Sequence, residues 1–172
     1  MSRRQTRHLF VMRLLAVLAA ALVAAASPAP TAEGEAGQKL PRFVSLRSDQ
    51  VNLRVGPGEN YPIDWVLTRK EMPVEIVKEF ENWRMIRDWQ GTEGWVHERM
   101  LTGKRAVVVK GGIRTLHRQP DPASPAVARA QPGVIARLLE CRADWCRIDA
   151  ADHAGWVQRG DLWGVYPDEI VQ

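Results

Sequence analysis

Short hydrophobic runs separated by turn residues follow one another along most of the chain, and their lengths predict β-strands. Clear examples are residues 74–80, 83–87 and 94–96. The polar pair Glu81-Asn82 and the segment 142–144 each lie between two such runs, which is typical of a tight hairpin. Beyond the signal-like N-terminus, no window of about a dozen residues carries a clean helical period, so the pattern predicts an all-β fold.

The hydrophobic, glycine and proline positions repeat after a little over 60 residues. Leu53, Pro57 and Pro62 return as Leu116, Pro120 and Pro125; Trp83 and Ile86 return as Trp145 and Ile148; Gly94-Trp95-Val96 returns as Gly155-Trp156-Val157; and Leu101 and Gly103 return as Leu162 and Gly164. A repeat of this length is a domain rather than one unit of a solenoid. Roughly five short strands in each copy suit a small, strongly bent barrel. We therefore predict two tandem barrels, over residues 41–104 and 105–172.

Residues 1–26 have the layout of a secretory signal peptide. A basic lead of four arginines precedes an acid-free apolar run, Leu14 to Ala26, which ends in the small residues Ala24 and Ala26. We expect cleavage after Ala26 and a mature protein in the periplasm or outside the cell. The alternative is an uncleaved anchor, but this run is shorter than the roughly 20 residues that cross a bilayer. Contact with a membrane is therefore expected only transiently, through the signal peptide.

The next segment, 27–40, is rich in proline, alanine, glycine and glutamate and is predicted to be a flexible linker. The signal peptide holds four of the chain's 24 basic residues, so the mature chain has 20 basic and 20 acidic residues. A nucleic-acid-binding protein needs a basic patch that neutralises phosphates, and the longest basic runs here are pairs. The composition therefore argues against nucleic acid as a partner.

Two segments of the first copy carry a family resemblance. Residues 51–62, VNLRVGPGENYP, are similar to the N-R-x-G-P-G-x-x-Y-P signature that opens bacterial SH3 (SH3b) domains, and residues 82–101 resemble their later W-x-x-I…G-W-V…L segment. In the second copy the signature is altered, with Gln119, Asp121 and Ser124 in place of Gly56, Gly58 and Tyr61. The resemblance implies two SH3-like barrels in a small protein of the bacterial envelope. SH3b domains commonly target wall enzymes to peptidoglycan or support protein contacts, so a binding role is implied.

The tripeptide Gly56-Pro57-Gly58 predicts a tight reversal in a long loop. Proline fixes φ between two glycines that can adopt a positive φ. The same residues could cradle a phosphate, but the helix and lysine of a P-loop do not follow them.

Both cysteines lie in one short segment, CRADWC, at Cys141 and Cys146. An even cysteine count in an exported protein favours a disulfide, and this spacing places one cysteine on each arm of a hairpin. The equivalent first-copy residues, Glu79 and Arg84, are an opposite-charge pair that could face across the same turn. A zinc site would have only His153 nearby as a further ligand. A nucleophilic cysteine would lack a base and its orienting group.

Aromatic residues supply the candidate binding surface. Trp95 and Trp156 are expected to pack within the barrels, because their flanking valines follow strand alternation. Trp83 and Trp145 should lie on the face opposite Ile86 and Ile148, either as half-exposed caps or as binding platforms. Tyr61, Trp65 and Trp89 could form an aromatic surface in the first copy alone, or could bury the interface between the barrels. The second copy has no equivalent of these three aromatics.

No enzyme constellation is apparent in the sequence. His97, His117 and His153 are far apart, and Asp88 and Glu93 are expected to be solvated on a hairpin loop. We therefore predict a non-catalytic envelope binding or adaptor module, without cofactor or metal, that recognises peptidoglycan peptide or an envelope protein. Its candidate ligand-binding residues are Arg54, Tyr61, Trp65 and Trp89. The eukaryotic SH3 proline-peptide groove is not assumed, because its A-L-Y-D-Y-type motif is missing. The alternatives are a structural subunit of a larger envelope complex and an auxiliary factor for a separate wall hydrolase.

Overall fold

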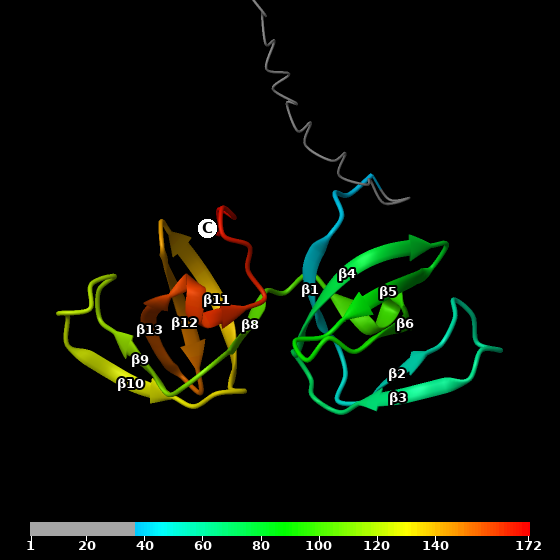
Figure 1. Ribbon diagram of the computed structural model, residues 1–172, viewed down its shortest axis with the longest axis horizontal. Helices are drawn as coiled ribbons and strands as arrows, with labels where there is room; N and C mark the ends of the chain where they lie inside the picture. Colours follow the sequence, from blue (N-terminus) through cyan, green and yellow to red (C-terminus); the bar gives the residue numbers. More distant parts are fainter. Residues whose placement is uncertain (1–36) are drawn as a thin grey trace, which may run out of the picture. The chain divides into compact units, whose positions relative to one another are not determined.

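The computed structural model describes residues 37–172, which form two seven-stranded antiparallel sheets (Figure 1). The predicted signal peptide and most of the predicted linker lie outside the described residues. The first sheet contains β1 (Arg42–Leu46), β2 (Val51–Arg54), β3 (Ile63–Leu67), β4 (Pro73–Phe80), β5 (Trp83–Arg87), β6 (Glu93–His97) and β7 (Leu101–Thr102). The second contains β8 (Ala106–Val109), β9 (Arg114–His117), β10 (Ala126–Ala130), β11 (Ile135–Arg142), β12 (Trp145–Ala150), β13 (His153–Gln158) and β14 (Leu162–Trp163).

The two sheets have the same topology. Their strand orders are β3-β2-β6-β5-β4-β1-β7 and β10-β9-β13-β12-β11-β8-β14, so each strand of the first has its counterpart seven strands later. A short 3-10 helix precedes the last strand of each sheet, η1 at Glu98–Met100 and η2 at Arg159–Asp161. This correspondence confirms the internal repeat and the two tandem barrels predicted from the sequence.

The sheets bend at matching irregularities. The longest strands, β4 and β11, each pair with the following strand across a two-residue turn. The register shifts between Ile76 and Lys78 in the first sheet and between Leu138 and Glu140 in the second. Such bulges kink a strand and increase its twist, which lets a small sheet curl around its own core.

Each barrel encloses its own hydrophobic cluster. The first contains Leu53, Ile86 and Val96, and the second contains the equivalent Leu116, Ile148 and Val157. The glycine of each G-W-V motif lies where β6 or β13 crosses this core. A Cβ at Gly94 would lie 2.5 Å from the Cγ of Leu53, and one at Gly155 would lie 2.8 Å from the Cβ of Leu116. The equivalent leucine therefore takes up the space of a Cβ at both positions, and only glycine fits there.

The tryptophans of these motifs do not belong to the core clusters. Val96 and Val157 face inward, so Trp95 and Trp156 lie on the outer face of each sheet. Trp95 is half-buried there, whereas Trp156 is buried beneath the guanidinium of Arg142, 5.4 Å from the ring centroid. Trp95 and Trp156 therefore pack against the outer surface of each barrel, and not in its interior.

Residues after β14 contact both barrels. The Tyr166 hydroxyl donates a hydrogen bond to Glu75 of β4 over 2.8 Å, and its ring lies 4.6 Å from that of Phe43 in β1. Burial and the bond to Glu75 raise the pKa of Tyr166 above its ordinary value. Burial would raise the pKa of Glu169, but hydrogen bonds from Arg105 and from the Tyr166 N–H outweigh it and lower that pKa.

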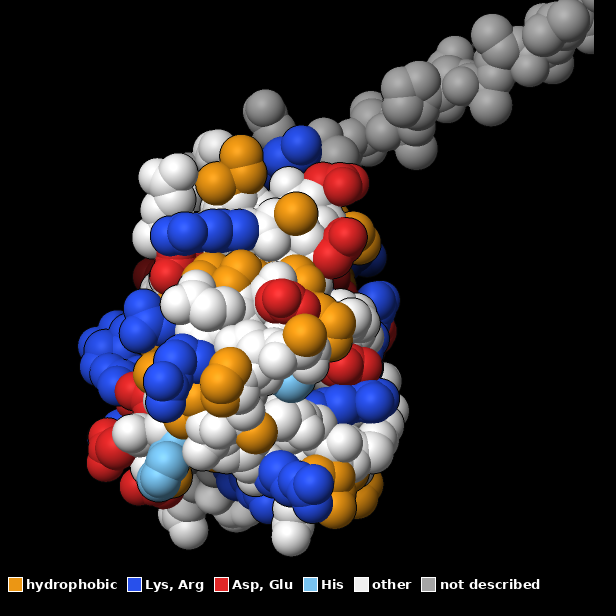
Figure 2. Space-filling model, turned by 90° about the vertical axis from the view of Figure 1, so that its left-hand side faces the viewer, with side chains coloured by type: hydrophobic (Ala, Val, Ile, Leu, Met, Phe, Trp, Pro, Cys, Tyr) orange, Lys and Arg blue, Asp and Glu red, His pale blue; other side chains and the backbone are white. Residues whose placement is uncertain are grey.

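The aromatic contacts between the two sheets do not come from Tyr61, Trp65 or Trp89, the candidates that the sequence offered for this interface. They are made by Phe43, Trp163 and Tyr166, with a Phe43–Trp163 centroid distance of 5.0 Å. Trp65 keeps 60% of its surface exposed with both barrels in place, so it is not buried between them. The face in Figure 2 mixes basic, acidic and isolated hydrophobic side chains, as expected for a solvated surface.

Candidate functional site

A groove on the first barrel combines an indole ring with several polar side chains. It is formed by β2, the following loop, the start of β5, the end of β6 and η1. Its volume is about 240 Å³. The groove is lined by Gln50, Asn52, Arg54, Glu59, Trp83, His97, Arg99 and Met100.

The second barrel has a groove at the equivalent positions. Its volume is about 270 Å³. Seven of its lining residues correspond to lining residues of the first groove: Ile113, Thr115, His117, Pro122, Trp145, Gln158 and Asp161. Only the tryptophan is the same residue in both, at positions 83 and 145. The fold therefore builds this groove twice, and the first copy lines it with more amide and charged side chains.

Trp83 is the apolar wall of the first groove. It opens β5, is half-buried, and lies on the face opposite the buried Ile86, as predicted. The ring of His97 packs edge-on against it, with centroids 5.4 Å apart and an interplanar angle of 67°. His97 Nδ1 accepts a hydrogen bond from the Arg99 N–H over 3.2 Å at the start of η1. The neutral ring accordingly carries its proton on Nε2, which makes that nitrogen a donor.

The second groove also has a histidine against its tryptophan, but this histidine comes from a different strand position. His117 packs edge-on against Trp145 at 5.8 Å, and it occupies the position of Arg54. Arg54 Nη1 donates to the Tyr61 carbonyl over 2.6 Å, while His117 Nδ1 lies 2.8 Å from the Ser124 carbonyl. In each barrel a side chain at the end of β2 or of its counterpart β9 therefore contacts the same carbonyl of the loop that borders the groove.

The Gly56-Pro57-Gly58 loop holds Tyr61 beside the groove. A Cβ at Gly56 would lie 2.3 Å from Tyr61 Cδ1, and one at Gly58 would lie 3.2 Å from Cδ2. Neither glycine has a positive φ. The predicted reversal is present, with a Gly58 N–H to Gly56 carbonyl bond of 3.0 Å, but the predicted reason for the glycines was wrong. They are needed because the tyrosine ring lies against them.

In the second copy polar contacts replace the ring packing in this loop. The Gln119 N–H donates to Ser124 Oγ over 3.0 Å, and the Ala123 N–H donates to Asp121 Oδ1 over 2.9 Å. The three residue differences from the SH3b signature are therefore mutually compatible. In the second copy serine leaves free the space that the tyrosine ring fills in the first. The two glycine positions can therefore carry side chains there.

The polar side chains of the first groove suit a ligand with carboxylates and amides. Arg54 and Arg99 supply guanidinium groups, and Gln50 and Asn52 supply amides that both donate and accept. Arg99 also forms an exposed ion pair with Glu59 at 3.5 Å. Such a pair contributes little stability in solvent, so exchanging Glu59 for a ligand carboxylate costs little.

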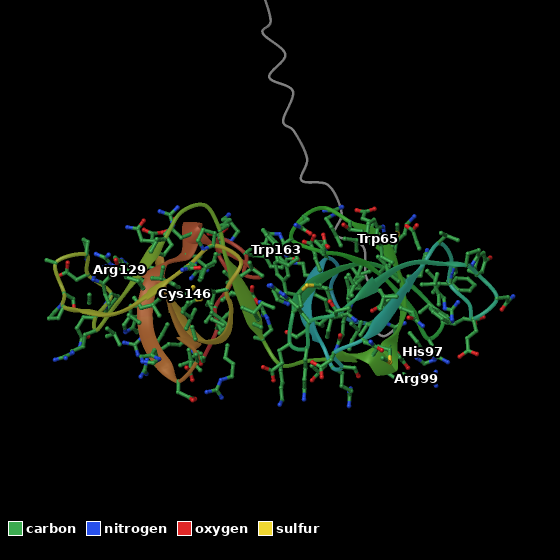
Figure 3. The ribbon with its side chains drawn as sticks, turned by 90° about the horizontal axis from the view of Figure 1, so that it is seen from below. Trp65, His97, Arg99, Arg129, Cys146 and Trp163 are labelled. Carbon is green, nitrogen blue, oxygen red and sulfur yellow. A yellow bond between two sulfur atoms is a disulfide. The ribbon has the colours of Figure 1, made fainter. Side chains whose placement is uncertain are left out.

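The structure separates the four sequence-predicted binding residues. Arg54 lines the groove, and Tyr61 lies in the loop that borders it. Trp65 lies in β3 and Trp89 in the β5–β6 turn, and neither lines the groove. Figure 3 shows Trp65 on the other side of the first barrel from His97. The aromatic triplet of Tyr61, Trp65 and Trp89 forms no ring–ring contact within residues 37–172.

Sequence reasoning did not single out His97, Arg99, Asn52 or Gln50 as binding residues. The signal that could have found them is the alignment of the two copies around Trp83 and Trp145. Positions equivalent between the copies gather around that shared tryptophan.

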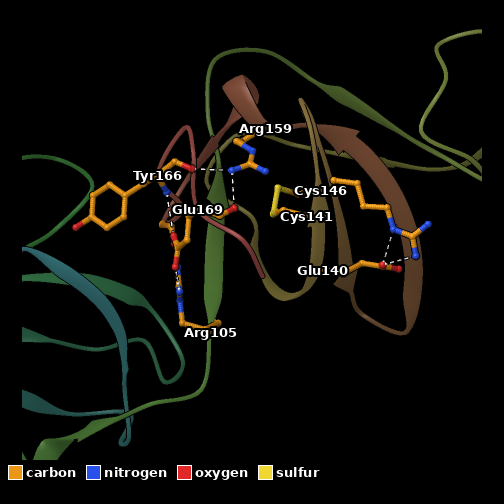
Figure 4. The surroundings of a disulfide bond; sticks show 9 residues. Arg105, Glu140, Cys141, Cys146, Arg159, Tyr166 and Glu169 are labelled. Atoms are coloured by element: carbon orange, nitrogen blue, oxygen red, sulfur yellow. Dashed lines mark hydrogen bonds and ion pairs between the residues drawn. A yellow bond between two sulfur atoms is a disulfide. The ribbon is translucent and has the colours of Figure 1, made fainter. Parts of the chain in front are cut away.

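The predicted disulfide is present between Cys141 and Cys146, which are direct partners in the β11–β12 pairing (Figure 4). In the first barrel Glu79 and Arg84 are partners in the same register, and their Oε1 and Nε lie 3.3 Å apart. One copy therefore carries a covalent link where the other carries an ion pair. Among residues 37–172 no cysteine is free, so the thiol needed for a nucleophile or zinc ligand is absent there.

The other carboxylates considered at the sequence level have structural contacts. Asp88 is buried, not solvated as expected, and its Oδ1 accepts hydrogen bonds from the Gln90 and Thr92 N–H groups. Glu93 forms an ion pair with Arg87, whose pKa it raises. Within residues 37–172 no three His, Cys, Asp or Glu side chains are grouped as metal ligands. That part of the chain also contains no helix long and apolar enough to cross a membrane.

Comparison with known proteins identifies one family. The model of the bacterial SH3 domain matches twice, at residues 47–103 and 110–164. No curated protein matches. Among solved structures, NlpC2 and NlpC1 from Trichomonas vaginalis are each 12% identical, with TM-scores of 0.35 and 0.32 over 75% and 77% of this chain. An NlpC/P60 family protein from Bacillus cereus is 12% identical, with a TM-score of 0.32 over 70%. The chain spans about half of each, at 50%, 48% and 55% of their lengths.

Proposed function

The chain belongs to the bacterial SH3 domain family, and from this premise we propose that it is a non-catalytic binding module that recognises the peptide part of peptidoglycan. Bacterial SH3 domains are binding modules of exported envelope proteins, so the family supplies the class of function. The proposal adds the ligand, the site and the location. It places the ligand in the first-barrel groove and the mature protein, cut after Ala26, in the periplasm or outside the cell.

The observation that carries this proposal is the duplicated groove around Trp83 and Trp145. Two copies that differ at most lining positions keep a tryptophan at the same place. Packing alone does not require this residue at the groove, because Trp83 is half-buried outside the core cluster. A half-exposed indole offers apolar contact area to a ligand at low cost in side-chain entropy.

The first groove fits an extended peptide that carries carboxylates. Arg54 and Arg99 can each hold a carboxylate, and Gln50 and Asn52 can pair with peptide amides. A peptidoglycan stem peptide presents both kinds of group along a short chain. The second groove carries Ile113, Thr115 and Pro122 in place of Gln50, Asn52 and Glu59, so it suits a less polar ligand.

The test is sedimentation of the processed protein with purified sacculi, comparing the wild type with Trp83→Ala. Loss of saturable binding is expected for Trp83→Ala, because the variant lacks the indole and His97 loses the ring against which it packs. Trp145→Ala, the equivalent change in the second barrel, is the matched control and should keep binding. Tyr61→Ala and Trp65→Ala then distinguish a residue of the loop that borders the groove from a residue of β3 that does not line it. Circular dichroism and the unfolding midpoint check that each variant is folded.

Wild-type protein that stays in the supernatant at every concentration would overturn the proposal. That result would favour a structural subunit of an envelope complex. Hydrolysis of sacculi by the purified chain alone would overturn its non-catalytic part. Release of wall fragments only when a separate hydrolase is added would favour the auxiliary role.

A further inference from the structure

The second barrel has another pocket besides the groove at Trp145, with a volume of about 600 Å³. It is formed by η2, β14 and the residues that follow β14, together with Phe43 of β1. Trp145 lines both this pocket and the smaller groove. Pockets of this size hold small molecules or single residues of a peptide. The pocket therefore has room for one large side chain and the backbone next to it.

A buried arginine, Arg159 of η2, lines this pocket with 8% of its surface exposed. Its Nη1 donates to the carbonyls of Tyr166 and Glu169 over 2.9 and 2.8 Å (Figure 4). Its Nε is buried and has no hydrogen-bond partner among residues 37–172. Within the same residues Arg159 forms no ion pair. A buried cation without a counter-ion is costly, so this environment favours an anionic ligand.

The equivalent positions of the first barrel are balanced in charge. There Arg42 forms an ion pair with Glu79, and Arg84 forms ion pairs with both Glu79 and Glu98. The Arg84–Glu98 pair is 2.5 Å long. Two arginines therefore lie beside two glutamates, and the first barrel supplies its own counter-ions.

The second barrel lacks this balance. Its residues at the positions of Arg42, Glu79, Arg84 and Glu98 are Arg105, Cys141, Cys146 and Arg159. Arg105 forms an ion pair with Glu169, and Arg159 binds the backbone carbonyl of that same residue. Two arginines therefore lie beside one glutamate, which leaves one positive charge without a counter-ion.

The other side chains of the pocket indicate what the anion is attached to. Trp145 and Trp163 are half-buried, and their indole rings suit a bulky apolar group. Lys110 is exposed and adds a second positive charge. The carboxylate of the exposed Asp144 can accept a peptide N–H. A carboxylate, an N–H group and an apolar side chain occur together in the last residue of a polypeptide.

We propose that this pocket binds the C-terminal residue of a protein chain that ends in a bulky apolar side chain. The terminal carboxylate pairs with Arg159 and Lys110, and the apolar side chain lies against Trp145 and Trp163. Capture of a terminal carboxylate is a recurring mode of peptide recognition. A D-alanine end has only a methyl group and would leave the indoles uncovered. The pocket is therefore assigned a different ligand from the stem peptide of the first-barrel groove.

Isothermal titration calorimetry of the processed chain with the peptide acetyl-Ala-Ala-Phe tests the proposal. The peptide with a free carboxylate should bind at least about tenfold more tightly than the same peptide with a C-terminal amide, since a charge-assisted bond is lost. Acetyl-Lys-D-Ala-D-Ala, which represents a stem peptide, should bind at least about tenfold more weakly than acetyl-Ala-Ala-Phe, because it buries less apolar surface.

Arg159→Gln should abolish the preference for the carboxylate over the amide, which a general loss of stability would not do. Because Arg159 also binds two backbone carbonyls, the exposed Lys110 provides a second variant. Lys110→Gln should weaken binding of the carboxylate peptide about threefold. Lys70→Gln is the matched control, since Lys70 is exposed and does not line the pocket, and it should change nothing.

The two proposed sites are tested separately. Trp83→Ala, in the first-barrel groove, should leave binding of acetyl-Ala-Ala-Phe unchanged, and Lys110→Gln should leave sedimentation with sacculi unchanged. No binding of acetyl-Ala-Ala-Phe at millimolar concentrations, equal affinity for its carboxylate and amide forms, or a carboxylate preference that is unchanged in both pocket variants would overturn the inference. Equal or tighter binding of the D-alanine peptide would overturn the assignment to a protein end.

Discussion

Replacing Cys141 and Cys146 with alanine removes the covalent link across the β11–β12 turn and should destabilise the second barrel. The two residues are direct strand partners, and their Cα atoms are 4.0 Å apart. Both are part of the second core cluster, and Cys146 is fully buried. In the folded protein the hairpin keeps its backbone pairing, so the main effect of losing the link falls on the unfolded chain.

The magnitude follows from the size of the closed loop. The cysteines are five residues apart, and the chain-entropy model assigns a loop of this size about 2 kcal/mol of stabilisation at 25 °C. With a urea dependence of roughly 2 kcal/mol per molar, the unfolding midpoint should fall by about 1 M. The two missing sulfur atoms leave a small cavity, which adds a further loss.

Urea unfolding followed by tryptophan fluorescence measures this loss for the oxidised wild type, the reduced wild type and the double alanine variant. Reduction breaks the link but keeps the sulfur atoms, so the reduced wild type gives the effect of the link alone. The reasoning would be refuted if the reduced and oxidised proteins differed by less than about 0.5 kcal/mol. A loss confined to the alanine variant would assign the stabilisation to packing rather than to loop closure.

Two further outcomes test other contacts. Gly56→Ala should lower the free energy of unfolding by about 1–3 kcal/mol, because its Cβ overlaps the Tyr61 ring. The loss should be much smaller in a Tyr61→Ser background, since serine stands at the equivalent position of the second copy. Equal losses of thermal stability in both backgrounds would contradict the assigned contact. Because burial and Glu75 raise the pKa of Tyr166, its contribution to stability is fully present below the ordinary tyrosine pKa of about 10 and is lost as pH rises through the folded value. Urea unfolding above about pH 10 should therefore show a steeper fall in the wild type than in Tyr166→Phe, and identical slopes would exclude this linkage.

The hairpin that carries the disulfide shows how much local sequence can determine. A two-residue turn sets the register of the two strands that it joins. Residues directly opposite each other on two paired strands point to the same face of the sheet. The separation of Cys141 and Cys146 therefore predicts that they face each other, and Glu79 and Arg84 follow by the repeat. The strands, the turns and the duplication are likewise local or periodic features, and the structure confirms them.

Predictions about the roles of single residues were less complete. Valine–tryptophan alternation showed that Trp95 and Val96 lie on opposite faces, but not which face was the interior. That depends on which way the sheet curls. The Leu53 side chain lies against Gly94 on the inner face, where β2 and β6 are paired neighbours. The glycines of the Gly56-Pro57-Gly58 loop were expected for their backbone freedom, whereas the space taken by Tyr61 requires them.

By itself the sequence determined the all-β class, the two copies, the hairpins and the disulfide, because these depend on short-range periodicity and on spacing within one turn. Only the tertiary structure decided that the groove joins Asn52, Trp83 and His97, which lie on three different strands. It also decided that β3 lies at the edge of its sheet and that Phe43 and Tyr166 connect the barrels. The physical reason is that strand pairing and sheet curvature bring together residues far apart in sequence, and no local pattern records which strands become neighbours.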